Sequence, residues 1–135
     1  MKIVLDTNVL IAAFISPKGI SHEVFELCVR SHSLFSSEFI LNEFKEKLKH
    51  KFYYDEKEIT EIIDLISAKF KIVKIKGEKI KVCRDVDDNN IIETAVSAKA
   101  DVIITGDDDL LVLKNYKDIE IISPREFYNL EKGIS

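Results

Sequence analysis

The sequence VIITGD at residues 102–107 decides how this chain folds, because a run of β-branched residues ends there abruptly in a polar turn. Val102, Ile103 and Ile104 show no alternation with polar residues, which is typical of a strand buried on both faces of a parallel sheet. A second run of this kind covers residues 119–122. The sequence therefore predicts an α/β sandwich with a mostly parallel central sheet.

The start of the chain also has a short apolar run that ends in polar residues. Residues 3–5 are a short apolar run, followed by Asp6, Thr7 and Asn8 and then by a mainly apolar segment, residues 9–14. This order predicts a buried strand that runs into a helix. Residues 34–35 predict another brief strand.

Five further helices are predicted from apolar residues at helical spacing and from polar residues that can cap a helix start. The helix after Asp55 ends near Lys69, and Asp55 with Glu58 makes a capping pair. In the last helix Ser123 caps, Pro124 occupies the first turn and Glu126 completes the capping box. The five predicted starts are Ser21, Ser36 or Ser37, Asp55, Asp88 and Ser123.

A stretch of alternating lysines and apolar residues covers residues 72–82. This alternation predicts edge strands with one solvated face. From residue 69 to residue 84 there are seven basic residues and one acidic residue. We predict that Lys74, Lys76, Lys79 and Lys81 guide phosphates toward the acidic segment that follows, although they could instead only protect a sheet edge from aggregation.

Size and composition are those of an ordinary folded protein. The 135 residues are 46% hydrophobic and 33% charged, with four glycines and two prolines, so we expect residues 1–135 to form one domain. The net charge of -4 argues against a passive nucleic-acid coat protein. The N-terminus reaches a charge at Asp6 without a signal sequence, and no segment is apolar enough to span a membrane, which predicts a cytoplasmic protein.

Carboxylates follow the predicted buried strands. In an open parallel sheet the functional site lies beyond the carboxyl ends of the strands, and Asp6 and Asp107 both come directly after such ends. Asp88 begins a predicted helix, and its side chain could face the same edge. Each of these aspartates could instead simply cap the next helix. Glu43 lies within a helix beside its apolar stripe, and the simpler interpretation is a solvated pair with Lys47.

Together, four carboxylates at one sheet edge would repel one another unless a cation neutralised them. The histidines, at positions 22, 32 and 50, have no metal-binding spacing, and Cys28 and Cys83 are interpreted as packing residues. Carboxylate oxygens alone favour Mg²⁺ or Mn²⁺ over zinc. Such a site suits phosphoryl chemistry, in which metal ions activate a water and neutralise charge on a scissile phosphate.

Taken in order, these motifs resemble PIN domains, and specifically the bacterial and archaeal toxins of toxin-antitoxin pairs. The resemblance covers almost the whole chain. The matching segments are VLDTNVL at residues 4–10, NEF at 42–44, RDVDDN at 84–89, TGDDDL at 105–110 and PREF at 124–127.

The resemblance implies a three-layer α/β/α fold, an RNA substrate cut with a divalent metal, an antitoxin partner and a homodimer. Asp6, Glu43, Asp88 and Asp107 occupy the family's acidic positions, which are the catalytic and metal-binding ones. Asn8 and Thr105 occupy supporting polar positions.

Two features depart from the family pattern. Many relatives carry proline where Val86 stands, and three consecutive aspartates leave Asp109 as an alternative to Asp107 for the metal. Asp85 and Asp87 are expected to shape the loop.

Other functions remain open at this point. A response-regulator receiver or an aspartyl phosphatase also places aspartate after its first strand. The phosphatases need a second aspartate two residues later, where this chain has Asn8, and no phosphoacceptor aspartate follows a middle strand. A PIN fold that binds RNA or a partner without cutting is the other alternative, but here all four acidic positions are filled.

Overall fold

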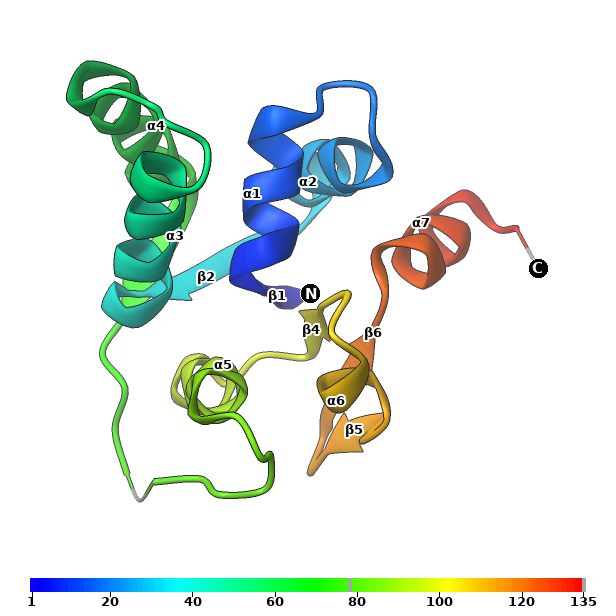
Figure 1. Cartoon of the computed structure of the whole chain (residues 1–135). Coiled ribbons are helices and arrows are strands. Elements are labelled where there is room, and N and C mark those ends of the chain that lie inside the picture. Colours follow the sequence, from blue (N-terminus) through cyan, green and yellow to red (C-terminus); the bar gives the residue numbers. More distant parts are fainter. Residues whose placement is uncertain (78, 135) are drawn as a thin grey trace.

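A six-stranded sheet forms the middle layer of the computed structural model, which describes residues 1–77 and 79–134 (Figure 1). The strand order is β3-β2-β1-β4-β6-β5, and every neighbouring pair is parallel except β5 with β6. The predicted mostly parallel sheet is confirmed. The strands are β1 (Lys2–Leu5), β2 (Ser33–Ser37), β3 (Phe70–Val73), β4 (Val102–Ile104), β5 (Asn115–Tyr116) and β6 (Ile119–Ile122).

Helices cover both faces of this sheet. Figure 1 shows α1, α2, α3, α4 and α7 on one side and α5 on the other, with the short α6 beside β5. The predicted three-layer α/β/α arrangement is therefore confirmed. The helices are α1 (Thr7–Ile15), α2 (Ile20–Ser31), α3 (Glu38–His50), α4 (Glu56–Lys69), α5 (Val86–Ala98), α6 (Asp108–Leu111) and α7 (Pro124–Lys132).

The two central strands are buried as their sequences predict. Ile3, Leu5, Ile103 and Ile104 expose 1% of their surface or less. Val4 pairs with Ile103 of β4, so the apolar runs lie side by side between the helical layers. Full burial of such a side chain contributes about 1.5–3 kcal/mol, which makes these strands the rigid base for the residues that follow them.

Polar caps begin three helices where the sequence predicts them. The Ser37 hydroxyl accepts from the Ile40 amide at 3.4 Å, which decides between Ser36 and Ser37. Asp55 and Glu58 form a reciprocal capping box at α4. A second capping box joins Ser123 to Glu126 at α7.

The prediction of edge strands over residues 72–82 is wrong beyond Val73. β3 is an edge strand, but residues 74–77 and 79–82 form an irregular segment, and Glu78 lies outside the described residues. The amides in this segment bond to α5 instead of to a neighbouring strand. Lys76 N donates to Ser97 Oγ at 2.9 Å, and Ile80 N donates to Glu93 Oε2 at 3.2 Å. Helix side chains therefore replace the strand ladder that the alternation suggested.

Two short elements have no prediction from the sequence, namely α6 with four residues and β5 with two. Neither is long enough to show a hydrophobic period. In the part of the chain that is described, every helix is too short or too polar to cross a membrane.

Phe44 joins α3 to α1 and so brings Glu43 toward the end of β1. Its side chain is fully buried, and its ring meets Phe14 of α1 edge-on, with 5.9 Å between the ring centroids. Glu43 precedes Phe44 in the chain and is half-buried.

We expect Phe44→Ala to lower the free energy of unfolding by about 3–5 kcal/mol, because it removes a buried ring and leaves a cavity. Urea unfolding of both proteins measures this difference. Leu65→Ala is the control, since Leu65 of α4 is 44% exposed, and it should cost less than about 1 kcal/mol. Equal losses in the two variants would contradict the assigned role of Phe44.

Candidate functional site

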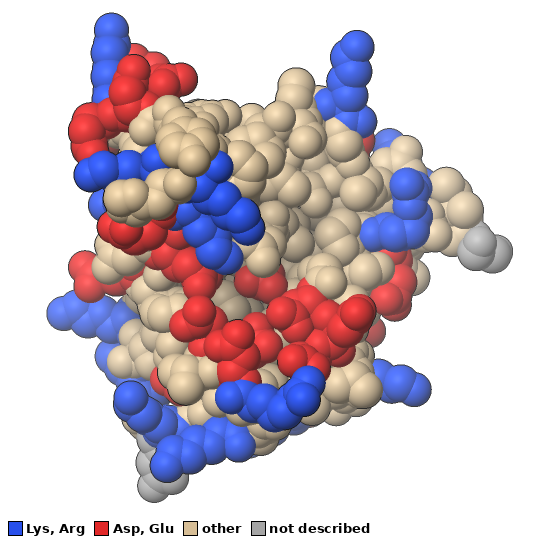
Figure 2. Space-filling view, viewed as in Figure 1, with Lys and Arg blue, Asp and Glu red and all other residues tan. Residues whose placement is uncertain are grey.

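The strand order reverses between β1 and β4, and the predicted acids gather at that point. From β1 the chain builds β2 and β3 on one side, and then returns to place β4 on the other. Asp6 follows β1, whereas Thr105 and Asp107 follow β4. Ligands of open α/β sheets bind at such switch points. Figure 2 shows Asp and Glu side chains gathered in one patch on this face.

Asp6 is held by the strand beside it. Thr105 Oγ1 donates to Asp6 Oδ2 at 2.6 Å, and the Asp107 amide donates to the same Thr105 hydroxyl at 3.0 Å. Asp6 occupies the N-cap position of α1, but its side chain makes no capping hydrogen bond. The capping alternative is therefore wrong for Asp6, because its carboxylate takes the short bond to Thr105. The predicted proximity of Thr105 to the acids is observed.

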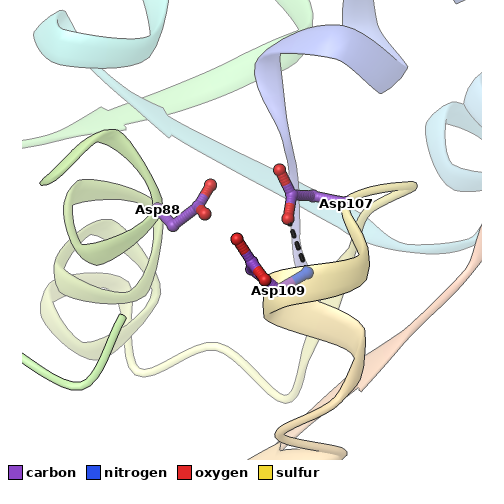
Figure 3. A group of neighbouring side chains, drawn as sticks. All are labelled: Asp88, Asp107 and Asp109. Carbon is purple, nitrogen blue, oxygen red and sulfur yellow. Dashed lines mark hydrogen bonds between the residues drawn. The ribbon is translucent and has the colours of Figure 1, made fainter. Parts of the chain in front are cut away.

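Three aspartates form the tightest group of the site. Carboxylate oxygens of Asp88, Asp107 and Asp109 all lie within 4.8 Å of one another (Figure 3). Asp88 projects from the first turn of α5 toward the other two, which come from the start of α6. Asp107 also caps α6, since its Oδ1 accepts from the Asp109 amide at 2.8 Å. Asp107 therefore caps α6 and belongs to the group of three aspartates at the same time.

Asp88 is not the cap of its helix. The α5 helix begins at Val86, and Asp85 is the N-cap, accepting from the Asp87 amide at 2.9 Å. Asp88 lies three residues further on, still in the first turn, where its side chain faces Asp107 and Asp109 rather than the helix end. Its Oδ2 atom is buried without a hydrogen-bond partner. A buried acceptor of this kind is costly unless something else satisfies it.

All four predicted acids line one small cavity. The cavity has a volume of about 80 Å³ and is lined by Asp6, Asn8, Glu43, Lys47, Asp85, Asp87, Asp88, Ile91 and Asp107. The tight aspartate group does not include Asp6 and Glu43, which lie around it. Lys47 Nζ donates to Asn8 Oδ1 at 2.9 Å. The simpler interpretation of Glu43 is not supported, since no Glu43–Lys47 salt bridge occurs among the described residues.

Burial and mutual repulsion raise the pKa of three carboxyls. The pKa of Asp88 rises to about 7, first through burial and then through the charges of Asp107, Asp85, Asp6 and Asp109. Burial also raises the pKa of Asp6, against the lowering effect of the Thr105 hydrogen bond. Burial raises the pKa of Glu43, and Asp87 adds to the effect while Lys47 opposes it. A nearby cation would offset this repulsion.

The oxygen-only donor set fits a hard divalent cation. The three clustered side chains offer carboxylate oxygens, and the unpartnered Asp88 Oδ2 is available as a ligand. Mg²⁺ and Mn²⁺ favour such ligands, whereas zinc favours histidine and cysteine. The residues present therefore fit the predicted type of metal.

Basic residues border the acidic patch, and sequence reasoning missed one of them, Arg84. Arg84 donates to Asp109 Oδ1 at 2.9 Å. Arg84 directly precedes the aspartates of the RDVDDN segment, and this position could have identified it from the sequence. Figure 2 shows lysine and arginine side chains on opposite sides of the patch. The four predicted lysines are exposed on the irregular segment after β3, outside the acidic cavity.

Known proteins share this sequence pattern and this fold. A family model described as PIN domain matches residues 2–109. The uncharacterized protein MJ1680 of Methanocaldococcus jannaschii is 36% identical over 150 aligned positions, which cover all of this chain and 95% of that protein.

Two solved structures have the same fold at low sequence identity. VapBC2 from Rickettsia felis, bound to a DNA fragment from its promoter, matches with a TM-score of 0.66 and 13% identity over 91% of this chain and 98% of that one. FitAcB from Neisseria gonorrhoeae matches with a TM-score of 0.55 and 14% identity over the same shares of the two chains.

We expect the metal-free protein to lose stability as pH rises from about 4 to 7. Because the pKa of Asp88 is raised on folding, the folded state binds its proton more tightly than the unfolded state, and this advantage disappears on deprotonation. Asp88→Asn should flatten this dependence and be more stable than the parent by about 1–3 kcal/mol at pH 8.

Denaturant unfolding at pH 5 and pH 8 in the presence of a chelator measures this effect. Asp64→Asn is the control, because Asp64 is exposed on α4, and it should keep the parent's pH dependence. An unchanged pH dependence in Asp88→Asn would show that the cluster does not strain the fold.

Proposed function

The chain belongs to the PIN-domain family, and on that premise we propose that residues 1–135 form a single nuclease domain, a metal-dependent endoribonuclease that hydrolyses RNA phosphodiester bonds. The family predicted from the sequence is confirmed. The observation that carries the proposal is the group formed by Asp88, Asp107 and Asp109, whose oxygens lie within 4.8 Å of one another at the switch point of the sheet. Repelling carboxylates in such a place suit a cation and a phosphate substrate.

In this proposal Asp88, Asp107 and Asp109 hold Mg²⁺ or Mn²⁺, and Asp6 and Glu43 complete the acidic wall. When bound, such an ion activates a water and neutralises charge on the scissile phosphate and on the departing oxygen. The unpartnered Asp88 Oδ2 supports the choice of Asp88 as a ligand. Thr105 keeps the Asp6 carboxylate oriented through its 2.6 Å hydrogen bond.

In this proposal basic side chains bind the phosphates of the RNA substrate. Lys47 lines the acidic cavity, and Arg84 bonds to Asp109, a member of the group of three aspartates. Phosphates of an RNA strand that crosses the patch would replace the Asn8 and Asp109 oxygens as partners of these two side chains. Lys74, Lys76, Lys79 and Lys81 extend the basic border and are proposed to guide the strand.

We propose further that the protein is a cytoplasmic toxin, with an antitoxin protein and a second copy of itself as partners. The sequence resemblance and the shared fold with VapBC2 and FitAcB support this role. Two apolar side chains close to the acids in sequence are also open to solvent: Val86 is 66% exposed and Val112 is 72% exposed. Apolar residues beside a charged site suit a protein that covers it.

Removal of divalent metal should abolish RNA cleavage, and Mg²⁺ or Mn²⁺ should restore it. Asp88→Asn should lower the cleavage rate at least about a hundredfold, which corresponds to roughly 2.7 kcal/mol of barrier, because it removes an anionic ligand. Metal should also raise the melting temperature of the parent more than that of Asp88→Asn. Gel-based cleavage and thermal unfolding provide the two measurements.

Asp64→Asn serves again as the matched control and should cut RNA at the parent's rate. Cleavage that continues unchanged in excess chelator would overturn the proposed mechanism. Metal binding without any cleavage would leave a PIN fold that binds RNA or a partner.

Replacing Lys74, Lys76, Lys79 and Lys81 by alanine should weaken binding of single-stranded RNA and make it less sensitive to salt. The slope of log affinity against log salt should fall by about 0.7 for each lost phosphate contact. Fluorescence anisotropy with an uncut, chelator-treated sample measures this slope. Lys57→Ala, an exposed lysine of α4, should keep the parent slope. Equal slopes in all proteins would assign the four lysines to protection of the sheet edge.

A further inference from the structure

A second cavity lies between the irregular segment after β3, helix α5 and strand β5. Its volume is about 320 Å³, which is within the range of small-molecule sites. The five acids of the proposed metal site do not line it. Its walls combine three kinds of group, namely the carboxylate of Glu93, the ring of Tyr116 and the ammonium groups of Lys79, Lys81 and Lys117.

Glu93 is the unusual member of this wall, because it is a carboxylate with only 7% of its surface exposed. Its Oε2 accepts from the Ile80 amide at 3.2 Å, and within the described residues no donor bonds to Oε1. A carboxylate can accept about four hydrogen bonds, so Glu93 can accept further ones. Oε1 is not sealed in the core but open to the cavity, where it can accept hydrogen bonds from a ligand that brings donors.

Tyr116 and Lys117 supply contacts of another kind. Tyr116 is half-buried on β5, and Lys117 Nζ lies 5.6 Å from the centroid of its ring. An aromatic ring beside lysines is the combination that stacks a nucleobase and binds the attached phosphate. Ile80 and Val82 add apolar surface to the same cavity.

We propose that this cavity binds one nucleotide of the RNA and selects guanine. The proposal rests on the ribonuclease function proposed above. Guanine presents two adjacent donors, N1–H and the N2 amino group, to the two oxygens of a carboxylate. Uracil presents one donor between two acceptors, and adenine and cytosine each place an acceptor beside their amino group. Glu93 therefore pairs with guanine better than with any other base, while Tyr116 stacks on it and the lysines bind its phosphate.

Helix α5 connects this cavity to the acidic site. Asp88 and Glu93 are five residues apart on it, which places them about 7.5 Å apart along the helix axis and roughly 140° apart around it. The segment that lines the cavity continues to Arg84, which contacts Asp109. An RNA strand can thus pass from the acids, over Arg84, to the second cavity. The recognised guanine then lies near the cleaved phosphodiester bond but outside the acidic site where that bond is cut.

The test is nucleotide binding in excess chelator, where no cleavage occurs. GMP, IMP, AMP, CMP and UMP are titrated into the ¹⁵N-labelled protein, and affinities are taken from amide chemical shifts. GMP should bind at least about tenfold more tightly than UMP. IMP, which lacks the N2 amino group, should bind more weakly than GMP. The shifts should concentrate at Lys81, Glu93 and Tyr116 rather than at Asp88 and Asp107.

Two variants separate base selection from general binding. Glu93→Gln keeps an oxygen for the Ile80 amide but presents an amide donor to guanine, so the preference for GMP should disappear. Tyr116→Leu should weaken all five nucleotides alike. Glu61→Gln, an exposed glutamate of α4, is the matched control and should bind as the parent does. Melting temperatures show whether each variant is folded.

Equal affinities for all five nucleotides in the parent, or a GMP preference that survives in a folded Glu93→Gln protein, would overturn the proposal. The comparison of GMP with IMP decides the matter if Glu93→Gln fails to fold. Selective GMP binding by a protein that cuts no RNA would refute the ribonuclease function and leave the guanine site in place. RNA cleavage by a protein that binds all five nucleotides equally would refute the guanine site and leave the ribonuclease function in place.

Discussion

The hydrogen bond from Thr105 to Asp6 joins the ends of the two central strands, and the acidic site is built around it. At 2.6 Å it is short, and Thr105 is fully buried. The same hydroxyl accepts a hydrogen bond from the Asp107 backbone amide, so one side chain holds the Asp6 carboxylate and the backbone that carries Asp107. Without the buried pairing of β1 with β4 beneath it, these groups would have no fixed separation.

Carboxylates brought together in this way oppose folding. Burial and neighbouring charges raise the pKa of Asp88 to about 7, so the metal-free fold carries a cluster that destabilises it increasingly as pH rises from about 4 to 7. The apolar core tolerates this cost because its central strands are fully buried. Natural domains have a margin of only about 5–15 kcal/mol, so such a cluster persists where a ligand compensates it. The arrangement is thus better suited to binding a cation than to stabilising the fold.

Helix α5 links the acidic cavity to the second cavity. Its first turn carries Asp88, its middle carries Glu93 and its last turn carries Ser97. Glu93 and Ser97 hold the irregular segment after β3 through its amides. The cap at Asp85 sets where the helix begins and therefore where Asp88 points. A shift of the helix start by one residue would rotate Asp88 by roughly 100° and remove it from Asp107 and Asp109.

Much of the fold could be predicted from the sequence, because it is encoded within a few residues. The apolar runs at residues 3–5 and 102–104 became buried parallel strands, and residues 119–122 became a parallel strand with only Glu120 exposed. Ser37, Asp55 and Ser123 became helix caps. The rule that sites lie at strand ends brought Asp6 and Asp107 to one edge. Glu43 and Asp88 lie on helices, where the residues alone left simpler roles open, and the family resemblance assigned them to the acidic site whose cavity the four acids line.

Only the tertiary structure decided which partner each polar group takes. The sequence allowed Asp88 to be a cap and residues 72–82 to be strands, but Asp85 caps the helix, and Glu93 and Ser97 bind the segment. Likewise, Thr105 binds Asp6 from 99 residues away. Periodicity and capping are local properties that neighbours in the chain determine. Hydrogen-bond partners depend on distances that exist only after distant elements have packed, so residue order alone could not supply them.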